Sequence, residues 1–337
     1  MTQIRCGSGG LARVAGELDR PATVVTGEAS ARRSGALDRL LEAMDRARGS
    51  TAVVAVTSHP GPDAVDRVLA QACLPGTVLI GLGGGSVLDV TKVAASRLAG
   101  SAGWVAIPTL WGSGAEVTPF AALWDRTVGK LSLRATPARQ VVVLPELASG
   151  APQSHLATAA LDCIAHAVDV SLSNGPDRTA RRRAELALGL TARHMPGVLR
   201  AVPRSLTRMA AASILGGLAL AGGGSGPSHA LSYPLRLRHD IPHGLSCALL
   251  LPGLVRAAGR QEPAMVAPVA RALRAPDAEG AARRLETLIE GAGFPLRLGA
   301  HGVVPSEVDQ IVAEAEPIRL ARTGFSLDAR RMLLELL

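Results

Sequence analysis

The sequence predicts two domains of different architecture: an α/β N-terminal domain built on a parallel sheet, followed by an all-α C-terminal domain. In about the first 150 residues, short β-branched runs alternate with helical patterns, which is typical of βαβ units. From about Ser149 onward such runs are rare, and long stretches rich in Ala, Leu and Arg have helical spacing. We expect the domains to cover residues 1–148 and 149–337, with a boundary between Pro145 and Pro152.

The N-terminal elements follow from local apolar patterns and turn residues. Four strands are predicted, at Ala22–Thr26, Thr51–Val56, Val78–Leu82 and Trp104–Ile107. Helical patterns cover Asp63–Leu74 and Ser86–Ala99. The second of these helices begins directly after a strand and a run of glycines, so the three together form a strand–turn–helix unit.

Composition excludes several classes of protein. Hydrophobic residues make up 47% of the 337 residues and charged residues 19%, as expected of a globular chain rather than a disordered one. Aromatic residues are only 2%, which argues against a nucleic-acid partner, because single-stranded nucleic acids are bound by stacking on aromatic rings. The net charge of +8 is interpreted as an Arg-rich solvated surface, and attraction to anionic ligands is the alternative.

Cysteine usage and apolar runs bear on the location of the protein. Cys6, Cys73, Cys163 and Cys247 are far apart and form no CxxC pair, which favours a reducing compartment. The sequence shows no signal-peptide pattern, and we find no apolar run of the roughly 18 residues that a membrane span needs. We expect a cytoplasmic protein that has no membrane partner.

A glycine loop is the first candidate binding feature. The run Gly81-Leu82-Gly83-Gly84-Gly85-Ser86 follows an apolar strand and opens a helix. Glycines let the backbone approach a phosphate closely, and a helix N-terminus offers N–H groups to it. Ser86 is a candidate cap for that helix. The alternative is a tight turn without a ligand, because the spacing is not GxGxxG.

Metal-ligating residue types recur in the C-terminal half. Asp162 and His166 lie four residues apart in a helical pattern, so both project from one face, which Asp169 continues. Farther along, His229 and His243 flank a segment with the character of a loop. One carboxylate and three imidazoles suit divalent iron or zinc. Each of these residues taken singly is more readily explained by packing.

Four motifs, in order and spacing, resemble those of the iron-containing alcohol dehydrogenases. They are Gly83-Gly84-Gly85-Ser86-x-x-Asp89-x-x-Lys92, residues 107–118 (IPTLWGSGAEVT), residues 161–167 (LDCIAHA), and the separated pair His229-Ala230 and Pro242-His243-Gly244. The resemblance extends over about residues 20 to 255. It implies a dinucleotide bound across the N-terminal domain and a divalent metal in the cleft, with Fe²⁺ favoured and Zn²⁺ as the alternative. The implied metal ligands are Asp162, His166, His229 and His243.

The same resemblance implies roles for residues of the N-terminal domain. The predicted cofactor-binding residues are Gly27, Gly84, Gly85, Ser86, Asp89, Thr109, Leu110, Ser113 and Lys130. Gly27 stands where the family commonly has an acidic residue that binds the adenosine ribose. Because an acid there repels a 2′-phosphate, its absence, with Arg32 and Arg33 nearby, favours NADPH over NADH. Glu28 is the counter-evidence, since it could restore a preference for NADH.

Residues after His229 depart from the common family pattern. Tyr233 stands where many members have a further histidine, and it is the candidate catalytic proton donor; the alternatives are His239, water, or a role in shaping the pocket. Residues 226–235 (GPSHALSYPL) look most like a phosphonate-associated branch, whose members reduce phosphonoacetaldehyde to 2-hydroxyethylphosphonate. Arg236, Arg238 and His239 are the candidate substrate contacts, because guanidinium groups suit a phosphonate dianion; the alternative is that they face solvent.

The predicted function is therefore hydride transfer between NAD(P)H and a small aldehyde or primary alcohol, with phosphonoacetaldehyde as the substrate suggested by the branch. Alternatives are the reduction of lactaldehyde, maleylacetate or a similar compound, a lyase reaction like that of dehydroquinate synthase, and a binding protein without activity. The expected partner is a small molecule, and the resemblance is compatible with a homodimer.

Overall fold

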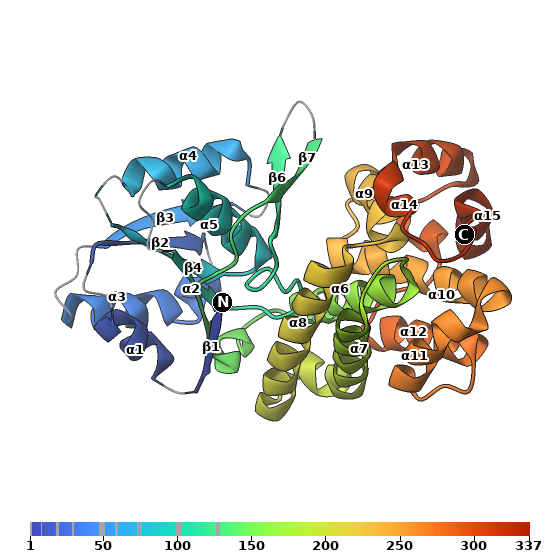
Figure 1. Ribbon diagram of the computed structural model, residues 1–337, viewed down its shortest axis with the longest axis horizontal. Coiled ribbons are helices and arrows are strands. Elements are labelled where there is room, and N and C mark those ends of the chain that lie inside the picture. Colours follow the sequence, from blue (N-terminus) through green and yellow to red (C-terminus); the bar gives the residue numbers. More distant parts are fainter. Residues whose placement is uncertain are drawn as a thin grey trace. The chain divides into compact units, whose positions relative to one another are not determined.

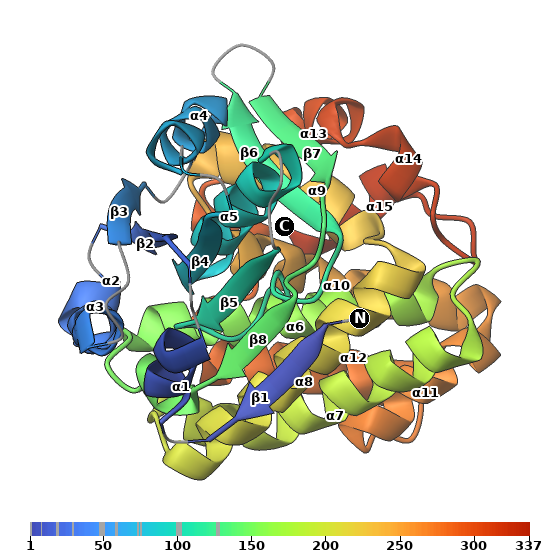
Figure 2. The ribbon, with the colours of Figure 1, turned by 60° about the vertical axis from the view of Figure 1, so that its left-hand side comes forward.

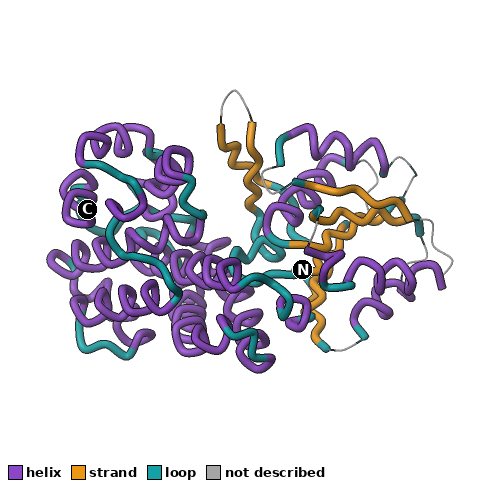
Figure 3. Tube along the Cα trace, turned by 180° about the vertical axis from the view of Figure 1, so that it is seen from behind, coloured by secondary structure: helices purple, strands orange, loops and turns teal. Residues whose placement is uncertain are grey.

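The computed structural model describes residues 2–7, 9–17, 20–28, 30–46, 51–57, 60–72, 74, 76–98, 103–125 and 129–337. The chain forms two compact units, Met1–Ala151 and Pro152–Leu337. Among the described residues, all strands lie in the first unit and the second unit is helical (Figure 3). The predicted fold class, a parallel-sheet α/β domain followed by a helical domain, is confirmed. Cys73 and the side chain of Arg33 lie outside the described part of the chain.

The first unit is built on a six-stranded parallel sheet with the order β1-β8-β5-β4-β2-β3 (Figure 2). Its strands are β1 (Gln3–Cys6), β2 (Ala22–Gly27), β3 (Thr51–Val56), β4 (Val78–Gly83), β5 (Trp104–Pro108) and β8 (Gln140–Val143). The four predicted strands correspond to β2, β3, β4 and β5, to within one residue at each end.

The remaining elements of the first unit are helices and a hairpin. They are α1 (Gly10–Glu17), α2 (Ser30–Arg33), α3 (Ala36–Arg46), α4 (Pro62–Gln71), α5 (Gly85–Arg97), the 3₁₀ helix η1 (Pro145–Ala148), and the antiparallel pair β6 (Phe120–Asp125) and β7 (Gly129–Arg134). Of these elements and the strands, α4 and α5 were predicted from the sequence, whereas β1, β8 and the hairpin were not. β1 is a largely exposed edge strand, and β7 is partly exposed, so neither has a continuous apolar run.

Helices cover both faces of the sheet, which explains why its central strands are apolar throughout. Ile80 and Leu82 of β4 belong to a core cluster that includes Leu37 of α3 and residues of α1. Gly81 faces the other way, and a Cβ there would lie 2.9 Å from Thr91 Oγ1 of α5. Figure 1 shows α1 and α3 on one side of these strands and α4 and α5 on the other.

The direction of strand addition reverses between β2 and β4. From β2 the chain proceeds outward to β3, whereas from β4 it proceeds to β5 and then β8 on the other side. Open α/β sheets bind ligands at such a reversal, beyond the carboxyl ends of the strands. Thr26 of β2 pairs with Leu82 of β4, so Gly27 and Gly83 end neighbouring strands at this point. The glycines predicted to bind a nucleotide therefore lie where the topology favours a ligand.

A buried ion pair joins α5 to the β6–β7 hairpin. The fully buried Lys92 Nζ lies 3.3 Å from Asp89 Oδ1 and donates to the carbonyl of Phe120, while Asp89 Oδ2 accepts a hydrogen bond from Ala122 N at 2.9 Å. Burial raises the pKa of Asp89 and lowers that of Lys92, against the attraction between the two. Asp89 was predicted to bind the cofactor. Because both its oxygens are engaged within the unit, we do not include it in the proposed cofactor site.

The second unit packs around α6 (Gln153–Leu172), which contacts α7, α8, α9, α10 and α11. Its other helices are α7 (Arg178–Leu199), α8 (Pro203–Gly223), α9 (Pro227–His239), α10 (His243–Gln261), α11 (Pro263–Leu273), α12 (Ala278–Gly291), α13 (Val308–Glu314), α14 (Pro317–Leu320) and α15 (Ala329–Leu336), with 3₁₀ helices η2 (Leu298–His301) and η3 (Pro305–Glu307).

Helix α8 corrects the expectation that no stretch is long and apolar enough for a membrane span. By length and composition it meets that criterion, although 56% of its apolar window is buried inside the unit. It packs on α6 and α7. Buried core helices pass the same test, so α8 is weak evidence for a span.

Removing one partner of the buried pair tests its structural role. Asp89→Ala removes the carboxylate that is hydrogen-bonded to buried Lys92 and leaves only Glu116, among the described residues, as a nearby negative charge, and we expect it to lower the free energy of unfolding by about 3 kcal/mol in urea titrations. The double variant Asp89→Leu/Lys92→Met removes both charges and should recover most of that loss. A double variant as unstable as the single one would contradict this account.

Candidate metal centre and nucleotide loop

Helix α6 carries three ionisable side chains along one face. Asp162, His166 and Asp169 lie at positions i, i+4 and i+7, which places them on the same side of the helix. All three side chains are buried, and the residues around them in α6 are mainly Ala, Val, Leu and Ile. Because buried polar groups cost free energy unless they are paired, neighbouring helices must supply hydrogen-bond or charge partners for these three side chains.

Two further helices supply the remaining histidines. His229 is the third residue of α9, and His243 is the first residue of α10, directly after a proline. The segment between them was expected to be a loop, but it is helical as far as His239. Pro234 lies inside α9, where proline usually breaks a helix. The buried residues on either side of it pack against α10 and α6, and this packing holds the helix together.

One oxygen of Asp162 faces three imidazole nitrogens. Asp162 Oδ1 lies 3.7 Å from Nε2 of His166, 3.7 Å from Nε2 of His229 and 3.6 Å from Nε2 of His243. These distances are too long for hydrogen bonds. They are close to the roughly 3.4 Å that separates ligands of one tetrahedral ion with bonds of about 2.1 Å. The structure thus brings together the four residues predicted as metal ligands.

Two donor atoms of this group lack hydrogen-bond partners in the described part of the chain, as expected of residues that bind a cation. Asp162 Oδ1 and His229 Nε2 are buried, and neither has a hydrogen-bond partner among the described residues. A lone pair buried without a partner costs free energy. A carboxylate and imidazoles are also the ligand types that divalent iron and zinc accept. The residues therefore fit a divalent cation.

A cysteine that the sequence analysis did not connect with the site lies beside it. Cys247 Sγ is 3.9 Å from Nδ1 and 4.0 Å from Nε2 of His243. One ligand atom from each of Asp162, His229, His243 and Cys247 lies within 4.8 Å of all the others. His166 is outside this tight group, but we retain it because its Nε2 is as close to Asp162 Oδ1 as that of His229. The four-residue spacing of His243 and Cys247 was the sequence signal that could have revealed the thiol.

Asp169 holds His229 from the side opposite Asp162. Its Oδ2 lies 2.8 Å from His229 Nδ1 and accepts a hydrogen bond from Gly226 N at 2.8 Å, and its Oδ1 accepts one from Ser228 N at 3.2 Å. A carboxylate on Nδ1 fixes the ring orientation and leaves Nε2 for a metal. A Cβ at Gly226 would lie 3.1 Å from Asp169 Cγ, so glycine permits this close approach.

A second glycine sets the distance between α10 and α6. A Cβ at Gly244 would lie 2.0 Å from the carbonyl oxygen of Thr158 and 3.0 Å from Asp162 Cβ. A side chain here would push the first turn of α10 away from α6. Because His243 is the preceding residue, its imidazole would move away from Asp162 as well.

The electrostatics of the cluster favour a positive charge at its centre. Burial by itself would raise the pKa of Asp162, but His166, His229 and His243 lower it below its usual range, so the carboxylate is ionised. Burial lowers the pKa of His166 to about 4 despite the attraction of Asp162, so that imidazole is neutral at neutral pH. Burial also opposes a charge on His229, yet Cys247 and the two aspartates raise its pKa well above the usual value. A proton on His229 or a divalent cation can supply the favoured charge.

Helix α9 places two further polar side chains on the same face as His229. Tyr233 and Arg236 lie at i+4 and i+7 from His229, on the same helical face, and both are half-buried. Burial lowers the pKa of Arg236, while Cys247 and Asp162 are among the groups that raise it. The guanidinium of Arg236 therefore lies within electrostatic reach of the cluster.

Of the other two residues predicted to contact the substrate, Arg238 is paired with a carboxylate and His239 lies near one. Arg238 Nε and Nη2 donate to the two carboxylate oxygens of Glu314 at 3.0 and 2.6 Å. His239 Nε2 lies 3.4 Å from Glu307 Oε2. Arg238 is paired with Glu314 and is left out of the proposed substrate site, Arg236 is kept because it shares the helical face of His229, and the role of His239 stays a prediction.

The glycine loop connects β4 to α5 in the first unit. Gly84 is the N-cap of α5 and has no side chain that could cap it, so Ser86, the predicted cap, is instead the second residue of the helix. A Cβ at Gly84 would meet nothing within 4 Å, whereas one at Gly85 would lie 3.0 Å from Ser113 Oγ. Thr109 N donates to the carbonyl of the last β4 residue at 3.0 Å, which ties the end of β5 to the loop. The uncapped helix start and the open space at Gly84 fit a phosphate group.

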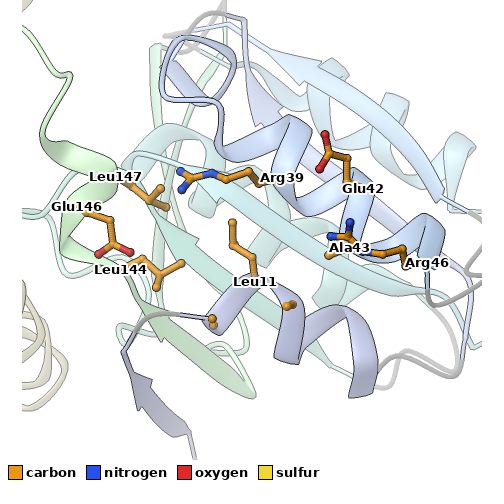
Figure 4. Close-up of a pocket in the computed structure, with 11 residues that line it drawn as sticks. Leu11, Arg39, Glu42, Ala43, Arg46, Leu144, Glu146 and Leu147 are labelled. Atoms are coloured by element: carbon orange, nitrogen blue, oxygen red, sulfur yellow. The ribbon is translucent and has the colours of Figure 1, made fainter.

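A surface pocket of the first unit lies apart from the predicted cofactor residues (Figure 4). Residues of α1, α3 and the segment after β8 line it, among them Leu11, Arg39 and Glu146. None of the predicted cofactor-binding residues lines this pocket.

Two further predicted cofactor-binding residues lie elsewhere in the first unit. Leu110 follows Thr109 in the segment after β5. Lys130 lies on β7, and its positive charge lowers the pKa of Asp89.

Comparison with known proteins connects these features to a family. Residues 1–145 match the family described as iron-containing alcohol dehydrogenase, and residues 156–335 match the C-terminal part of the Fe-containing alcohol dehydrogenase family. The chain belongs to the iron-containing alcohol dehydrogenase family. The resemblance inferred from the four motifs is confirmed.

Individual relatives show the range of proteins to which this member of the family is similar. A phosphonoacetaldehyde reductase of Streptomyces viridochromogenes is 34% identical over 60% of this chain and 59% of its own length. A 1-propanol dehydrogenase of Salmonella typhimurium is 31% identical over 65% of this chain and 62% of its own. The matches therefore span about six-tenths of these curated relatives. The crystal structure of a sulfoacetaldehyde reductase from Bifidobacterium kashiwanohense in complex with NAD+ has a TM-score of 0.89 at 24% identity, covering 99% of this chain and 96% of that one.

The contact between Asp169 and His229 predicts an effect on metal affinity. Asp169→Asn keeps the size of the side chain but weakens the hold on Nδ1, and we expect the affinity for zinc to fall roughly 10- to 100-fold. Competition with a chromophoric chelator measures this affinity. The control Asp309→Asn alters an exposed carboxylate of the same unit and should leave the affinity unchanged. Equal affinities for the wild-type protein and Asp169→Asn would show that Asp169 does not position the ligand.

Proposed function

We propose that this protein is a metal-dependent oxidoreductase that transfers hydride between a nicotinamide cofactor and a small aldehyde. The observation that carries the proposal is the buried Asp162 Oδ1, which has no hydrogen-bond partner and faces three imidazole nitrogens at 3.6–3.7 Å. Membership of the iron-containing alcohol dehydrogenase family supports iron as the ion, and zinc fits the same donors.

Asp162, His166, His229 and His243 would hold the ion. A divalent cation bound there supplies Lewis acidity toward a carbonyl oxygen, and a reduced nicotinamide supplies the hydride. The carboxylate of Asp162 offsets part of the cationic charge, and Asp169 keeps His229 in the orientation that presents Nε2. Burial of Asp162, His166 and His229 keeps water from their donor atoms, while the partly exposed His243 lies at the open side of the cluster. Tyr233, one turn from His229, is the proposed proton donor to the alkoxide oxygen of the product.

The proposed cofactor site lies at the reversal point of the sheet. Its members are Gly27, Gly84, Gly85, Ser86, Thr109, Leu110, Ser113 and Lys130. Gly27 ends β2 without a carboxylate, and the exposed Arg32 follows in α2. These features favour NADPH, because no acid at that position repels a 2′-phosphate. Glu28 is exposed next to Gly27 and is the residue that would favour NADH instead.

The proposed substrate is an aldehyde with an anionic group, of which phosphonoacetaldehyde is the example. Arg236 supports this choice, since its half-buried guanidinium lies on the metal-facing side of α9 and a planar guanidinium suits a phosphonate. Two of the relatives carry names of anionic acetaldehydes, one a phosphonate and one a sulfonate. A neutral alcohol or aldehyde is the second candidate, which the likeness to 1-propanol dehydrogenases favours.

Cellular setting and assembly belong to the same proposal. We propose a cytoplasmic location, and the finding that Cys6, Cys163 and Cys247 form no disulfide in the described part of the chain is in keeping with a reducing compartment. A homodimer is proposed from family membership.

A direct assay tests the activity. The protein is loaded anaerobically with ferrous iron, and NADPH absorbance is followed after addition of phosphonoacetaldehyde, with acetaldehyde and NADH as comparisons. We expect rapid NADPH oxidation that falls at least about 100-fold in Asp162→Ala, because that variant loses the central carboxylate. Unfolding curves of both proteins control for stability. Absence of turnover with any aldehyde, despite bound metal and cofactor, would contradict the proposed reaction, and faster turnover with NADH would contradict the cofactor preference.

If Arg236 binds the anionic group of the substrate, the enzyme should prefer anionic aldehydes to neutral ones. A charge-assisted hydrogen bond is worth about 1.5–3 kcal/mol, so Arg236→Gln should lower kcat/KM for phosphonoacetaldehyde roughly 10- to 100-fold. The value for acetaldehyde should change little. Arg271→Gln, which alters an exposed arginine paired with Glu185, is the matched control. A similar loss with both aldehydes would mean that Arg236 supports the fold and does not recognise the anion.

A further inference from the structure

The thiol of Cys247 is buried against the metal cluster. Cys247 lies one helical turn after His243 in α10, and its side chain is fully buried. Its Sγ is about equally distant from both ring nitrogens of His243, at 3.9 and 4.0 Å. Together with Asp162, His229 and His243 it forms the group whose ligand atoms all lie within 4.8 Å of one another. No other described cysteine belongs to that group.

A second buried cysteine shows that this placement is particular to Cys247. Cys163 follows Asp162 directly in α6 and is equally buried. Its Sγ instead accepts a hydrogen bond from Thr191 Oγ1 of α7 at 3.4 Å, and a Cβ at Gly216 of α8 would lie 3.4 Å from it. Cys163 therefore points toward α7 and α8. Burial and closeness in sequence to a metal ligand do not by themselves bring a thiol to the cluster.

Two buried donor atoms without hydrogen-bond partners lie close to the sulfur. Asp162 Oδ1 and His229 Nε2 are buried without hydrogen-bond partners, and both belong to the compact group that contains Cys247 Sγ. A cation that satisfies these two atoms is within reach of the sulfur. We propose that Cys247 is an additional ligand of the metal ion, binding as a thiolate beside the carboxylate and imidazoles. This inference rests on the metal site of the proposed function.

A sulfur ligand changes which ions the site prefers. Carboxylate and imidazole donors accept iron, zinc, cobalt and manganese, whereas thiolate is soft and favours zinc and cobalt over magnesium or manganese. Cys247 therefore biases the site toward thiophilic ions. On binding the metal, the thiol loses its proton to solvent and its sulfur lone pair forms the bond, so no oxidant or reductant is involved.

Cobalt(II) is a suitable probe, because its absorption spectrum shows both whether the metal binds and whether a thiolate is among its ligands. The full-length apoprotein is titrated anaerobically with cobalt(II), and its absorption spectrum is recorded for wild type, Cys247→Ser and Cys163→Ser. We expect one cobalt per chain and an intense near-ultraviolet thiolate-to-cobalt band in wild type and Cys163→Ser. Cys247→Ser should keep the weaker visible bands of bound cobalt and lose the thiolate band. Its affinity for zinc should fall at least about tenfold, as measured by chelator competition.

The outcomes separate this inference from the function on which it rests. Bound cobalt with visible bands but no thiolate band in wild type would overturn the role of Cys247 and leave the metal site intact. Failure of wild type to bind cobalt would overturn both. If Cys247→Ser fails to fold, X-ray absorption of the zinc-loaded wild type decides the question: a sulfur neighbour at about 2.3 Å is the expected result, and a shell of only nitrogen and oxygen would refute it.

Discussion

The candidate metal cluster of the second unit depends on the buried carboxylate of Asp162. Asp162 lies in an Ala- and Leu-rich helix, and its Oδ1 faces three imidazole nitrogens at nearly equal distances. An ionised carboxylate removed from water costs several kcal/mol unless opposite charge lies close to it. The three histidines lower its pKa and so maintain its charge, and a divalent cation would serve the same purpose more strongly. Much of the local structure is therefore arranged around one negative charge.

The backbone details of α9 and α10 follow from that arrangement. Gly244 lets the first turn of α10 approach the backbone of α6 closely enough for His243 to reach Asp162. Asp169 accepts hydrogen bonds from the backbone N–H groups of Gly226 and Ser228 at the start of α9, and it contacts Nδ1 of His229. Metal affinity and local stability are coupled here, because the same contacts position the ligands and join the helices. The cluster belongs entirely to the second unit, whereas the glycine loop belongs to the first.

The features that depend on one short segment of the chain were predictable from the sequence. The strands β2, β4 and β5 are buried runs, β3 is a half-exposed run of β-branched and small residues, and the spacing of Asp162, His166 and Asp169 is a property of one helix. Contacts between distant segments were not predictable. Glu314, which pairs with Arg238, is 76 residues away in the chain, and the hydrogen bond from Ala122 to Asp89 joins α5 to a hairpin whose second strand has no apolar run. The loop expected before His243 is a helix because packing overrides the effect of its internal proline.

The central claim is that one metal ion binds between Asp162 and the three histidines. Anomalous diffraction from crystals of the ferrous-loaded protein, recorded above and below the iron absorption edge, tests it most directly. The account predicts a single strong anomalous peak within about 2.3 Å of Asp162 Oδ1 and of Nε2 of His166, His229 and His243. A peak bound elsewhere, or no peak in protein whose crystals contain stoichiometric iron, would contradict it.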